Sequence, residues 1–171
     1  MDLKPFSYKK ILIVGDSGRG KTTFAHNLSS ITDIPYHSTD DYFWKVKYTE
    51  PNDREKSVEQ ISKVYDEPQW IMEGTTRRLI LKGLEQSEII FYLKHKNIFT
   101  QYISIIKRWA TREEERFFDL LNLLRHVTYK KYKKGYGDHM PHLEELLQPF
   151  KDKLVNIKSF KEIDRIIDNI K

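Results

Sequence analysis

The sequence contains no cysteine in its 171 residues and no long apolar run. The missing thiols exclude disulfide bonds, thiolate catalysis and cysteine-based zinc sites, and they leave the redox compartment open. No apolar stretch has the length of a membrane span, and residues 1–10 lack the apolar core of a signal peptide. We therefore expect a cytoplasmic protein without a membrane partner. The oligomeric state stays open.

Acidic residues are absent from residues 120–137, and this absence locates the net charge of +5. Five basic residues account for the whole excess: Arg125, Lys130, Lys131, Lys133 and Lys134. Three tyrosines interleave with them, as in surfaces that stack the bases of single-stranded nucleic acid. A solvated helix face or a flap explains the same composition. We favour that explanation over nucleic-acid binding by residues 125–136.

The remaining composition is that of an ordinary folded domain, with 39% hydrophobic and 32% charged residues. Short apolar runs predict five strands, at residues 9–14, 35–38, 70–72, 89–93 and 154–157. Helical periodicity follows most of them, and Ser159 and Glu162 form a capping box before the last helix. Because the two patterns alternate without a repeat or a linker, we expect one three-layered α/β domain over residues 1–171.

The clearest motif runs from Gly15 to Thr22 and has the spacing Gly, four residues, Gly-Lys-Thr. Glycines let backbone N–H groups converge on a phosphate, Lys21 adds a mobile positive charge, and Thr22 offers a hydroxyl to Mg²⁺. The helix that follows directs its positive end at the same anion. We expect nucleotide contacts from nine residues: Gly15, Asp16, Ser17, Gly18, Arg19, Gly20, Lys21, Thr22 and Thr23. A dinucleotide-binding fold is disfavoured, because Thr23 stands where its fingerprint needs a third glycine.

Carboxylates follow two of the predicted strands. Asp40 and Asp41 come after the strand at 35–38, and Glu73 comes directly after the strand at 70–72. Catalytic groups of open parallel sheets lie at such carboxyl ends. We expect Asp40 to serve Mg²⁺ with Thr22 or to orient an acceptor hydroxyl, and Glu73 to face the phosphate site. Helix capping is the structural alternative for these acids.

Three arginines recur at every fourth residue: Arg108, Arg112 and Arg116. Like charges at this spacing destabilise a helix unless something offsets them. The glutamates at 113–115 offset them in part, and a bound triphosphate is the other explanation. We expect a helical lid over about residues 108–136. The apolar stripe before it is expected in the core: Phe99, Tyr102, Ile103, Ile106 and Trp109.

The phosphate loop at 15–22, the segment at 35–44 and the strand end at 70–74 resemble the adenylate-kinase-like P-loop kinases, and among these the topology modulation protein family. The resemblance covers most of the chain. It implies a P-loop NTPase fold with a five-stranded parallel sheet ordered 2-3-1-4-5, ATP with Mg²⁺, and lid arginines that close on the phosphates. Two positions depart from the family, since relatives commonly have Asp in place of Glu73 and Pro in place of Lys94.

Together these residues predict an ATP-dependent phosphotransferase that acts on a small hydroxyl- or phosphate-bearing acceptor, with nucleotides among the candidates. The expected catalytic groups are Lys21, Asp40, Glu73, Arg108, Arg112 and Arg116. Two alternatives stay open: a polynucleotide kinase or RNA-associated ATPase, and a non-catalytic nucleotide-sensing module. Between Asp40 and Glu67, where the acceptor pocket is expected, the sequence carries no recognisable selectivity code.

Overall fold

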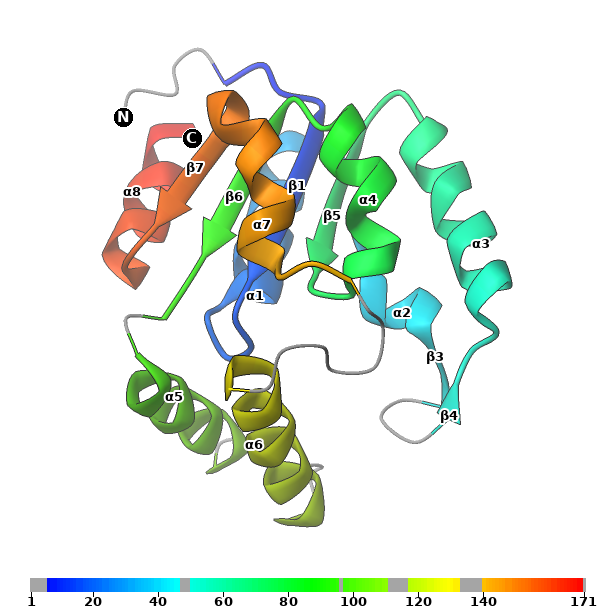
Figure 1. The fold of residues 1–171 in the computed structure, drawn as a ribbon. Coiled ribbons are helices and arrows are strands. Elements are labelled where there is room, and N and C mark those ends of the chain that lie inside the picture. The colour runs from blue at the N-terminus through cyan, green and yellow to red at the C-terminus, as the bar shows by residue number, and fades with distance from the viewer. Residues whose placement is uncertain (1–5, 47–49, 96, 111–116, 133–139, 171) are drawn as a thin grey trace.

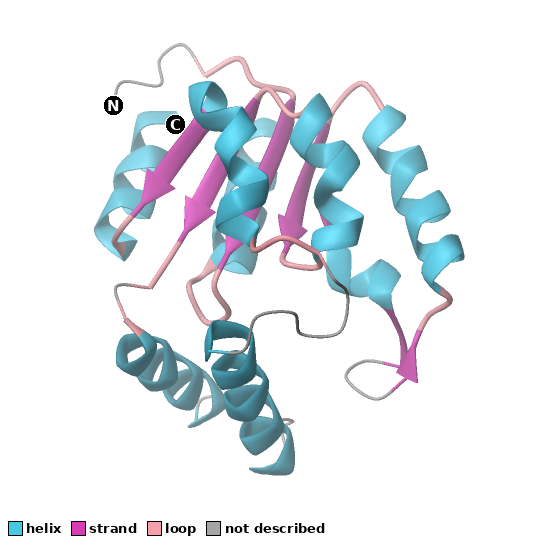
Figure 2. Ribbon diagram, in the orientation of Figure 1, coloured by secondary structure: helices cyan, strands magenta, loops and turns pink. Residues whose placement is uncertain are grey.

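The computed structural model describes residues 6–46, 50–95, 97–110, 117–132 and 140–170, and it contains a five-stranded parallel sheet (Figures 1 and 2). The sheet strands are β1 (Lys10–Gly15), β2 (Tyr36–Ser38), β5 (Trp70–Gly74), β6 (Ile89–Leu93) and β7 (Leu154–Ile157). They lie side by side in the order β2-β5-β1-β6-β7. Numbered along the chain, these five strands have the order 2-3-1-4-5, which confirms the predicted α/β fold.

The strands form where the apolar runs occur, and the central strands are buried on both faces. The side chains from Ile11 to Val14 have no exposed surface. β5 and β6 are also buried along their whole length, whereas the edge strands β2 and β7 are partly exposed. A continuous apolar run is stable only when helices cover both faces of the sheet. The predicted strand boundaries agree with the structure to within two residues.

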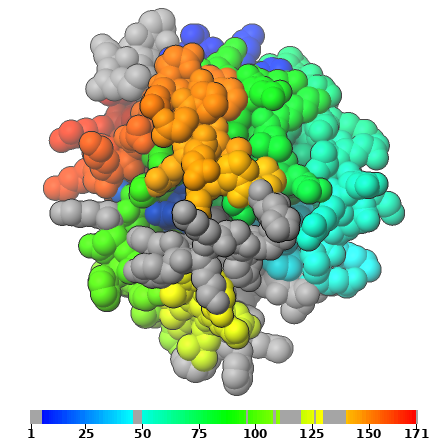
Figure 3. Space-filling view, in the orientation of Figure 1, coloured from blue at the N-terminus to red at the C-terminus, as the bar shows by residue number. Residues whose placement is uncertain are grey.

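Helices cover each face of the sheet (Figure 1). One face carries α1 (Lys21–Thr32) and α8 (Phe160–Ile170). The other carries α3 (Arg54–Asp66), α4 (Arg77–Gln86), α7 (Leu143–Leu147) and the 3₁₀ helix η1 (Gln148–Lys153). In the space-filling view, the orange residues of α7 and η1 fill the middle of this second face (Figure 3). Within the described ranges, no helix is both long and apolar enough to cross a membrane.

Local capping signals set where the helices begin. The carboxylate of Asp53 accepts two backbone N–H groups of the first turn of α3, at 2.9 and 3.1 Å. Such a cap contributes about 1 kcal/mol. At α8, the Ser159 hydroxyl accepts the N–H of Glu162 at 3.3 Å, and the Glu162 carboxylate accepts the N–H of Lys158 at 2.8 Å. The predicted capping box is present, with its return bond one residue earlier than usual.

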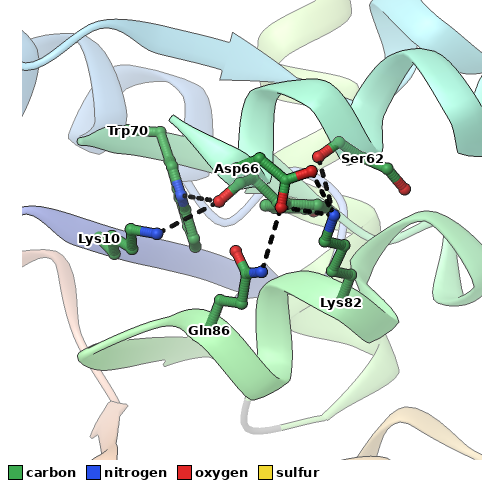
Figure 4. Close-up of polar contacts among 7 residues, drawn as sticks. Lys10, Ser62, Asp66, Trp70, Lys82 and Gln86 are labelled. Atoms are coloured by element: carbon green, nitrogen blue, oxygen red, sulfur yellow. Dashed lines mark hydrogen bonds and ion pairs between the residues drawn. The ribbon is translucent and has the colours of Figure 1, made fainter. Parts of the chain in front are cut away.

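A polar network closes the edge of the sheet at which β1 and β5 begin (Figure 4). The carbonyl of Tyr65 accepts hydrogen bonds from Trp70 Nε1 at 3.2 Å and from Lys10 Nζ at 3.3 Å. Lys82 on α4 donates to the Asp66 carboxylate at 2.7 Å. Asp66 is exposed, so this ion pair adds little stability. The Tyr65 carbonyl lies in the last turn of α3, where no N–H group of the helix is available to donate to it. The bonds from Trp70 and Lys10 supply the missing donors.

α5 (Ile98–Ala110) and α6 (Phe117–Tyr132) lie beyond the carboxyl ends of the strands and pack against each other. The buried contact uses Ile105 with Tyr102 and Trp109. Three members of the predicted apolar stripe are exposed instead: Phe99 by 72%, Ile103 by 54% and Ile106 by 45%. The prediction that the whole stripe lies in the core was therefore wrong. The apolar arc of α5 is wider than the surface that its neighbours cover.

The short elements between β2 and α3 were not predicted. They are α2 (Thr39–Phe43) and a hairpin of β3 (Trp44–Val46) and β4 (Glu50–Pro51). The Ser57 hydroxyl of α3 donates to the Tyr42 carbonyl at 2.7 Å, and the Asn52 N–H donates to the Phe43 carbonyl at 2.8 Å. These bonds fix the end of α2 against the start of α3. Their donors and acceptors are 9 to 15 residues apart, which helical or strand periodicity does not indicate.

Candidate active site

The phosphate loop connects β1 to α1 at the carboxyl edge of the sheet. Gly15 has a φ of 136°, and a Cβ there would lie 2.0 Å from the carbonyl oxygen of Leu93. Gly20 has a φ of 82° and comes directly before α1, for which the described residues supply no side-chain cap. The first backbone N–H groups of this helix have no helical acceptor. Helix starts of this kind are common binding sites for anions, which is the role that the motif predicts here.

The segment after β6 braces this loop from the side. The N–H of Asp16 donates to the Leu93 carbonyl at 2.8 Å, and the Asp16 carboxylate accepts the N–H of His95 at 2.8 Å. On α5, Gln101 Nε2 lies 3.4 Å from the carbonyl oxygen of Ser17. An added Cβ at Gly18 would lie 3.2 Å from the Ile105 side chain. The first half of α5 therefore supports the phosphate loop.

Arg19 is turned into the protein. It is 5% exposed, its Nε donates to the Lys94 carbonyl at 3.2 Å, and its guanidinium lies over the Phe160 ring. Burial lowers the pKa of Arg19, and the charges of Glu162 and Asp16 oppose that effect. The sequence suggested Arg19 as a nucleotide contact. Its described contacts instead join the loop to the chain after β6 and to the start of α8.

Lys21 and Thr22 begin α1 and lie at the surface of the site. The half-buried Lys21 folds back over the loop, with Nζ 3.1 Å from the carbonyl oxygen of Asp16. The exposed Thr22 donates its hydroxyl proton to Glu73 Oε1 at 3.2 Å. A hydroxyl has one proton and two lone pairs. The bond to Glu73 leaves both lone pairs of Thr22 for another ligand.

Glu73 is the centre of a buried hydroxyl cluster. It is 6% exposed and lies near the end of β5, opposite Ser38 of β2 and Ile13 of β1. Besides Thr22, Oε1 accepts the Ser38 hydroxyl at 3.0 Å and the Tyr36 hydroxyl at 3.3 Å. The sequence pointed to Glu73 but not to these partners. The predicted strand order already placed β2 beside β5, and this adjacency could have indicated that side chains of β2 reach Glu73.

Asp40 lies in the first turn of α2, and Ser38 connects it to Glu73. The Ser38 hydroxyl accepts the N–H of Asp40 at 3.3 Å while donating to Glu73. Beyond it, the Tyr42 hydroxyl lies 3.2 Å from His37 Nδ1, and burial lowers the pKa of His37. Ser38 is the cap of this short helix, so Asp40 is not needed for that purpose.

Four hydrogen bonds join the chain that follows the predicted lid to the edge of the site. Lys94 forms an ion pair with Glu144 of α7, and Tyr92 donates to the same carboxylate at 3.2 Å. The hydrogen bond from Lys94 is the largest cause that lowers the pKa of Glu144. Arg77 donates to the carbonyls of Met140 and Pro141 at 2.6 and 2.8 Å. From the sequence, Lys94 stood out only as a departure from the family that the chain resembles.

The predicted lid is described in part. Arg108 is in α5, one turn after Ser104, whose Cβ lies 3.5 Å from an added Cβ at Gly18. Arg112 and Arg116 lie outside the described residues, as do residues 133–136 of the basic segment. Within α6, the Arg125 guanidinium lies 5.7 Å from the Tyr129 ring centroid. One of the three expected arginines is thus on the helix that contacts the phosphate loop.

A separate groove of about 610 Å³ runs between α3 and α4, with Arg54, Val58, Arg78 and Leu81 among its lining residues. None of the phosphate-loop residues lines it. In the described part of the chain, no group of three His, Asp or Glu side chains could enclose a metal ion. Mg²⁺ in phosphotransfer sites usually keeps several waters and uses one or two protein groups with the substrate phosphates. The site around Thr22 and Glu73 suits that mode of binding.

Comparison with solved structures identifies the fold. Shikimate kinase from Acinetobacter baumannii, in complex with shikimate, superposes with a TM-score of 0.56 at 13% identity, covering 96% of this chain and 93% of that one. A gluconokinase from Sinorhizobium meliloti superposes with a TM-score of 0.55 at 13% identity, covering 95% of this chain and 89% of that one. The YorR protein from Bacillus subtilis, in complex with phosphorylated GDP, superposes with a TM-score of 0.53 at 15% identity, covering 94% of this chain and 92% of that one.

These similarities show that the chain has the P-loop fold of these proteins. A scan against protein-family models finds no match, and a search of curated proteins finds none either.

Proposed function

We propose that the chain is an ATP-dependent phosphotransferase that acts on a small hydroxyl- or phosphate-bearing acceptor. The observation that carries this proposal is the hydrogen bond between Thr22 and Glu73 at the carboxyl edge of a P-loop fold. An ordinary glycine-rich turn needs no buried carboxylate bonded to the threonine that follows its lysine. A site for phosphates with Mg²⁺ needs both groups.

The residues present fit ATP with Mg²⁺. Thr22 and Glu73 would supply the hard oxygen atoms that Mg²⁺ prefers. The loop amides from Gly15 to Thr23 and the Lys21 ammonium would hold the β- and γ-phosphates. Bound Mg²⁺ neutralises the charge that develops on the phosphates during transfer. This assigns to Glu73 the metal-side role expected for Asp40.

Asp40 is then the candidate for the acceptor. It lies in the turn after β2, adjoining the Ser38 and Glu73 pair, where a carboxylate can accept the proton of an incoming hydroxyl. Arg108, Arg112 and Arg116 complete the proposal as lid groups that stabilise the transferred charge. Residues 108–136 would close on the phosphates and exclude water from the reaction.

An acceptor screen with γ-³²P-labelled ATP and Mg²⁺ tests this function. The panel should include nucleosides, nucleotides, sugar acids and other small hydroxy metabolites, inorganic phosphate, and RNA with free 5′ ends. Transfer of label to a small acceptor, lost in Lys21→Ala, would support the proposal. Transfer to RNA ends alone, with steep salt dependence, would support a polynucleotide kinase instead. Tight ATP binding without label transfer to any member of the panel would favour a nucleotide-sensing module.

A further inference from the structure

Three hydroxyls from two elements meet at one oxygen of Glu73. Thr22 comes from α1, while Tyr36 and Ser38 come from β2, and all three donate to Oε1. Hydrogen bonds to a charged group are the strong ones, each worth about 1.5–3 kcal/mol. A buried carboxylate needs them, because burial without donors is costly. The position of this oxygen is therefore determined by several contacts.

The three donors have different surroundings. Thr22 is exposed, so it can meet ATP and a metal ion, whereas Ser38 is 7% exposed and Tyr36 is half-buried. A glutamate side chain has three rotatable bonds, and Thr22 alone does not hold them in one arrangement. The two hydroxyls from β2, the strand on the other side of β5 from β1, restrain the carboxylate as well. They therefore control the direction in which Thr22 presents its lone pairs.

Tyr36 is suited to this task. Its ring packs against His26 of α1 with 4.2 Å between the ring centroids and 43° between the ring planes, so the ring position is restrained as well as the hydroxyl. Burial, and secondarily the charge of Glu73, raise the pKa of Tyr36, so the phenol stays a donor at physiological pH. Ser38 has a second task, because its hydroxyl also caps α2 by accepting the N–H of Asp40.

We propose that Tyr36 is a positioning residue: with Ser38, its hydroxyl holds Glu73 Oε1 against Thr22 and thereby sets the affinity of the site for the Mg²⁺ that accompanies ATP. This inference rests on the proposed phosphotransferase function. It assigns Tyr36 no contact with substrate. Partners of metal-site groups typically change metal affinity by about 10–100-fold when they are lost. Because Ser38 remains, we expect a smaller effect for Tyr36.

The experiment is a titration with Mg²⁺ at a fixed ATP concentration, in which calorimetry measures ATP binding. Tyr36→Phe removes the hydroxyl and keeps the ring on His26. We expect it to raise the Mg²⁺ concentration at half-maximal effect about three- to tenfold, consistent with the loss of one of several partners. ATP affinity measured without Mg²⁺ should stay unchanged. The matched control is Tyr8→Phe, since Tyr8 lies before β1 and packs on Phe6 with 5.3 Å between the ring centroids.

A second variant separates positioning from a general loss of structure. In the Glu73→Gln background, Tyr36→Phe should cause no further change in the Mg²⁺ midpoint, because the charge that it positions is already absent. An equal shift in both backgrounds would mean that Tyr36 acts on the fold, and an unchanged midpoint in Tyr36→Phe would mean that it does not act on the metal. Either result overturns the inference and leaves the proposed function standing. A wild-type protein whose ATP binding ignores Mg²⁺ would overturn both.

Discussion

The guanidinium carbon of Arg19 lies 4.8 Å from the centroid of the Phe160 ring. The two residues belong to the phosphate loop and to the first turn of α8, and the Nε of Arg19 also donates to the Lys94 carbonyl. One buried cation thus holds together the loop, the chain directly after β6 and the last helix. This arrangement predicts that Arg19 stabilises the protein more than it binds nucleotide.

Replacing Arg19 with alanine should lower the free energy of unfolding by about 2–4 kcal/mol. The estimate combines about 1.5–3 kcal/mol for a hydrogen bond from a charged donor with about 0.5–1 kcal/mol for a cation on a partly exposed ring. Urea unfolding measures the change. The control is Arg165→Ala at an exposed position of α8, expected to stay within about 0.5 kcal/mol of wild type. Equal losses in the two variants would contradict the stabilising role of Arg19.

The orientation of α5 makes a sharp contrast between two isoleucines that are two residues apart. Ile105 is 1% exposed and Ile103 is 54% exposed. Ile105→Ala should cost about 2–5 kcal/mol, because it opens a cavity beside Trp109 and the phosphate loop. Ile103→Ala should cost no more than about 0.5 kcal/mol. Chemical denaturation of both variants distinguishes this orientation from the predicted one, in which Ile103 is in the core and would be costly to truncate.

Lys21→Ala should keep the fold and weaken the binding of ATP with Mg²⁺ by about 10–100-fold. The ammonium contributes a charge-assisted bond to the phosphates, worth about 1.5–3 kcal/mol, and little packing. The measurement is the rise in melting temperature that ATP with Mg²⁺ causes, because a ligand that binds the folded state stabilises it. Lys161→Ala, at an exposed position of α8, is the matched control. Wild-type turnover in Lys21→Ala would refute the assignment of the phosphate loop.

The buried ring of His95 predicts a dependence of stability on pH. Burial lowers the pKa of His95 below its ordinary 6.5, against the attraction of Asp16, and its Nε2 has no partner among the described residues. The unfolded chain therefore binds the proton more readily than the folded one. The contribution of His95 to stability is complete above pH 6.5 and is lost as the pH falls from there toward the lowered pKa.

Unfolding free energies between pH 5 and 8 check this prediction. Wild type should lose stability toward pH 5, and His95→Asn should lose less, because its amide takes up no proton. His142→Asn removes a second titratable ring, at the residue before α7, and serves as the control. If the unfolding free energies of His95→Asn and wild type change in parallel with pH, the titration of His95 does not contribute to the pH dependence of stability.

The lid assignment is tested at Arg112, which lies outside the described residues. Arg112→Ala should lower the turnover rate by about tenfold to a thousandfold, the range for losing one electrostatic stabiliser of a transition state. ATP affinity should change less, because the contact strengthens as charge moves. Hydrogen exchange over residues 108–136 should slow when ATP and Mg²⁺ bind. Unchanged exchange together with normal turnover would make these arginines surface partners of the glutamates at 113–115.

Local sequence was sufficient for the sheet and for the phosphate loop. Apolar runs such as Ile11 to Val14 specify buried strands because a parallel sheet buries both faces, and no distant residue is needed to see it. The glycine spacing from Gly15 to Gly20 is equally local, since it reports backbone angles that other residues seldom adopt. The order of the five strands followed from the family resemblance that these local motifs support.

Tertiary structure alone decided how the site is assembled. Thr22, Tyr36 and Ser38 stand 51, 37 and 35 residues from Glu73, and only the pairing of β2 with β5 and the position of α1 bring them to one oxygen. The inward direction of Arg19 depends on Phe160, which is 141 positions away. Periodicity identifies which side chains of α5 share a face, but when the apolar arc is wide, the neighbouring elements determine which part of it is buried.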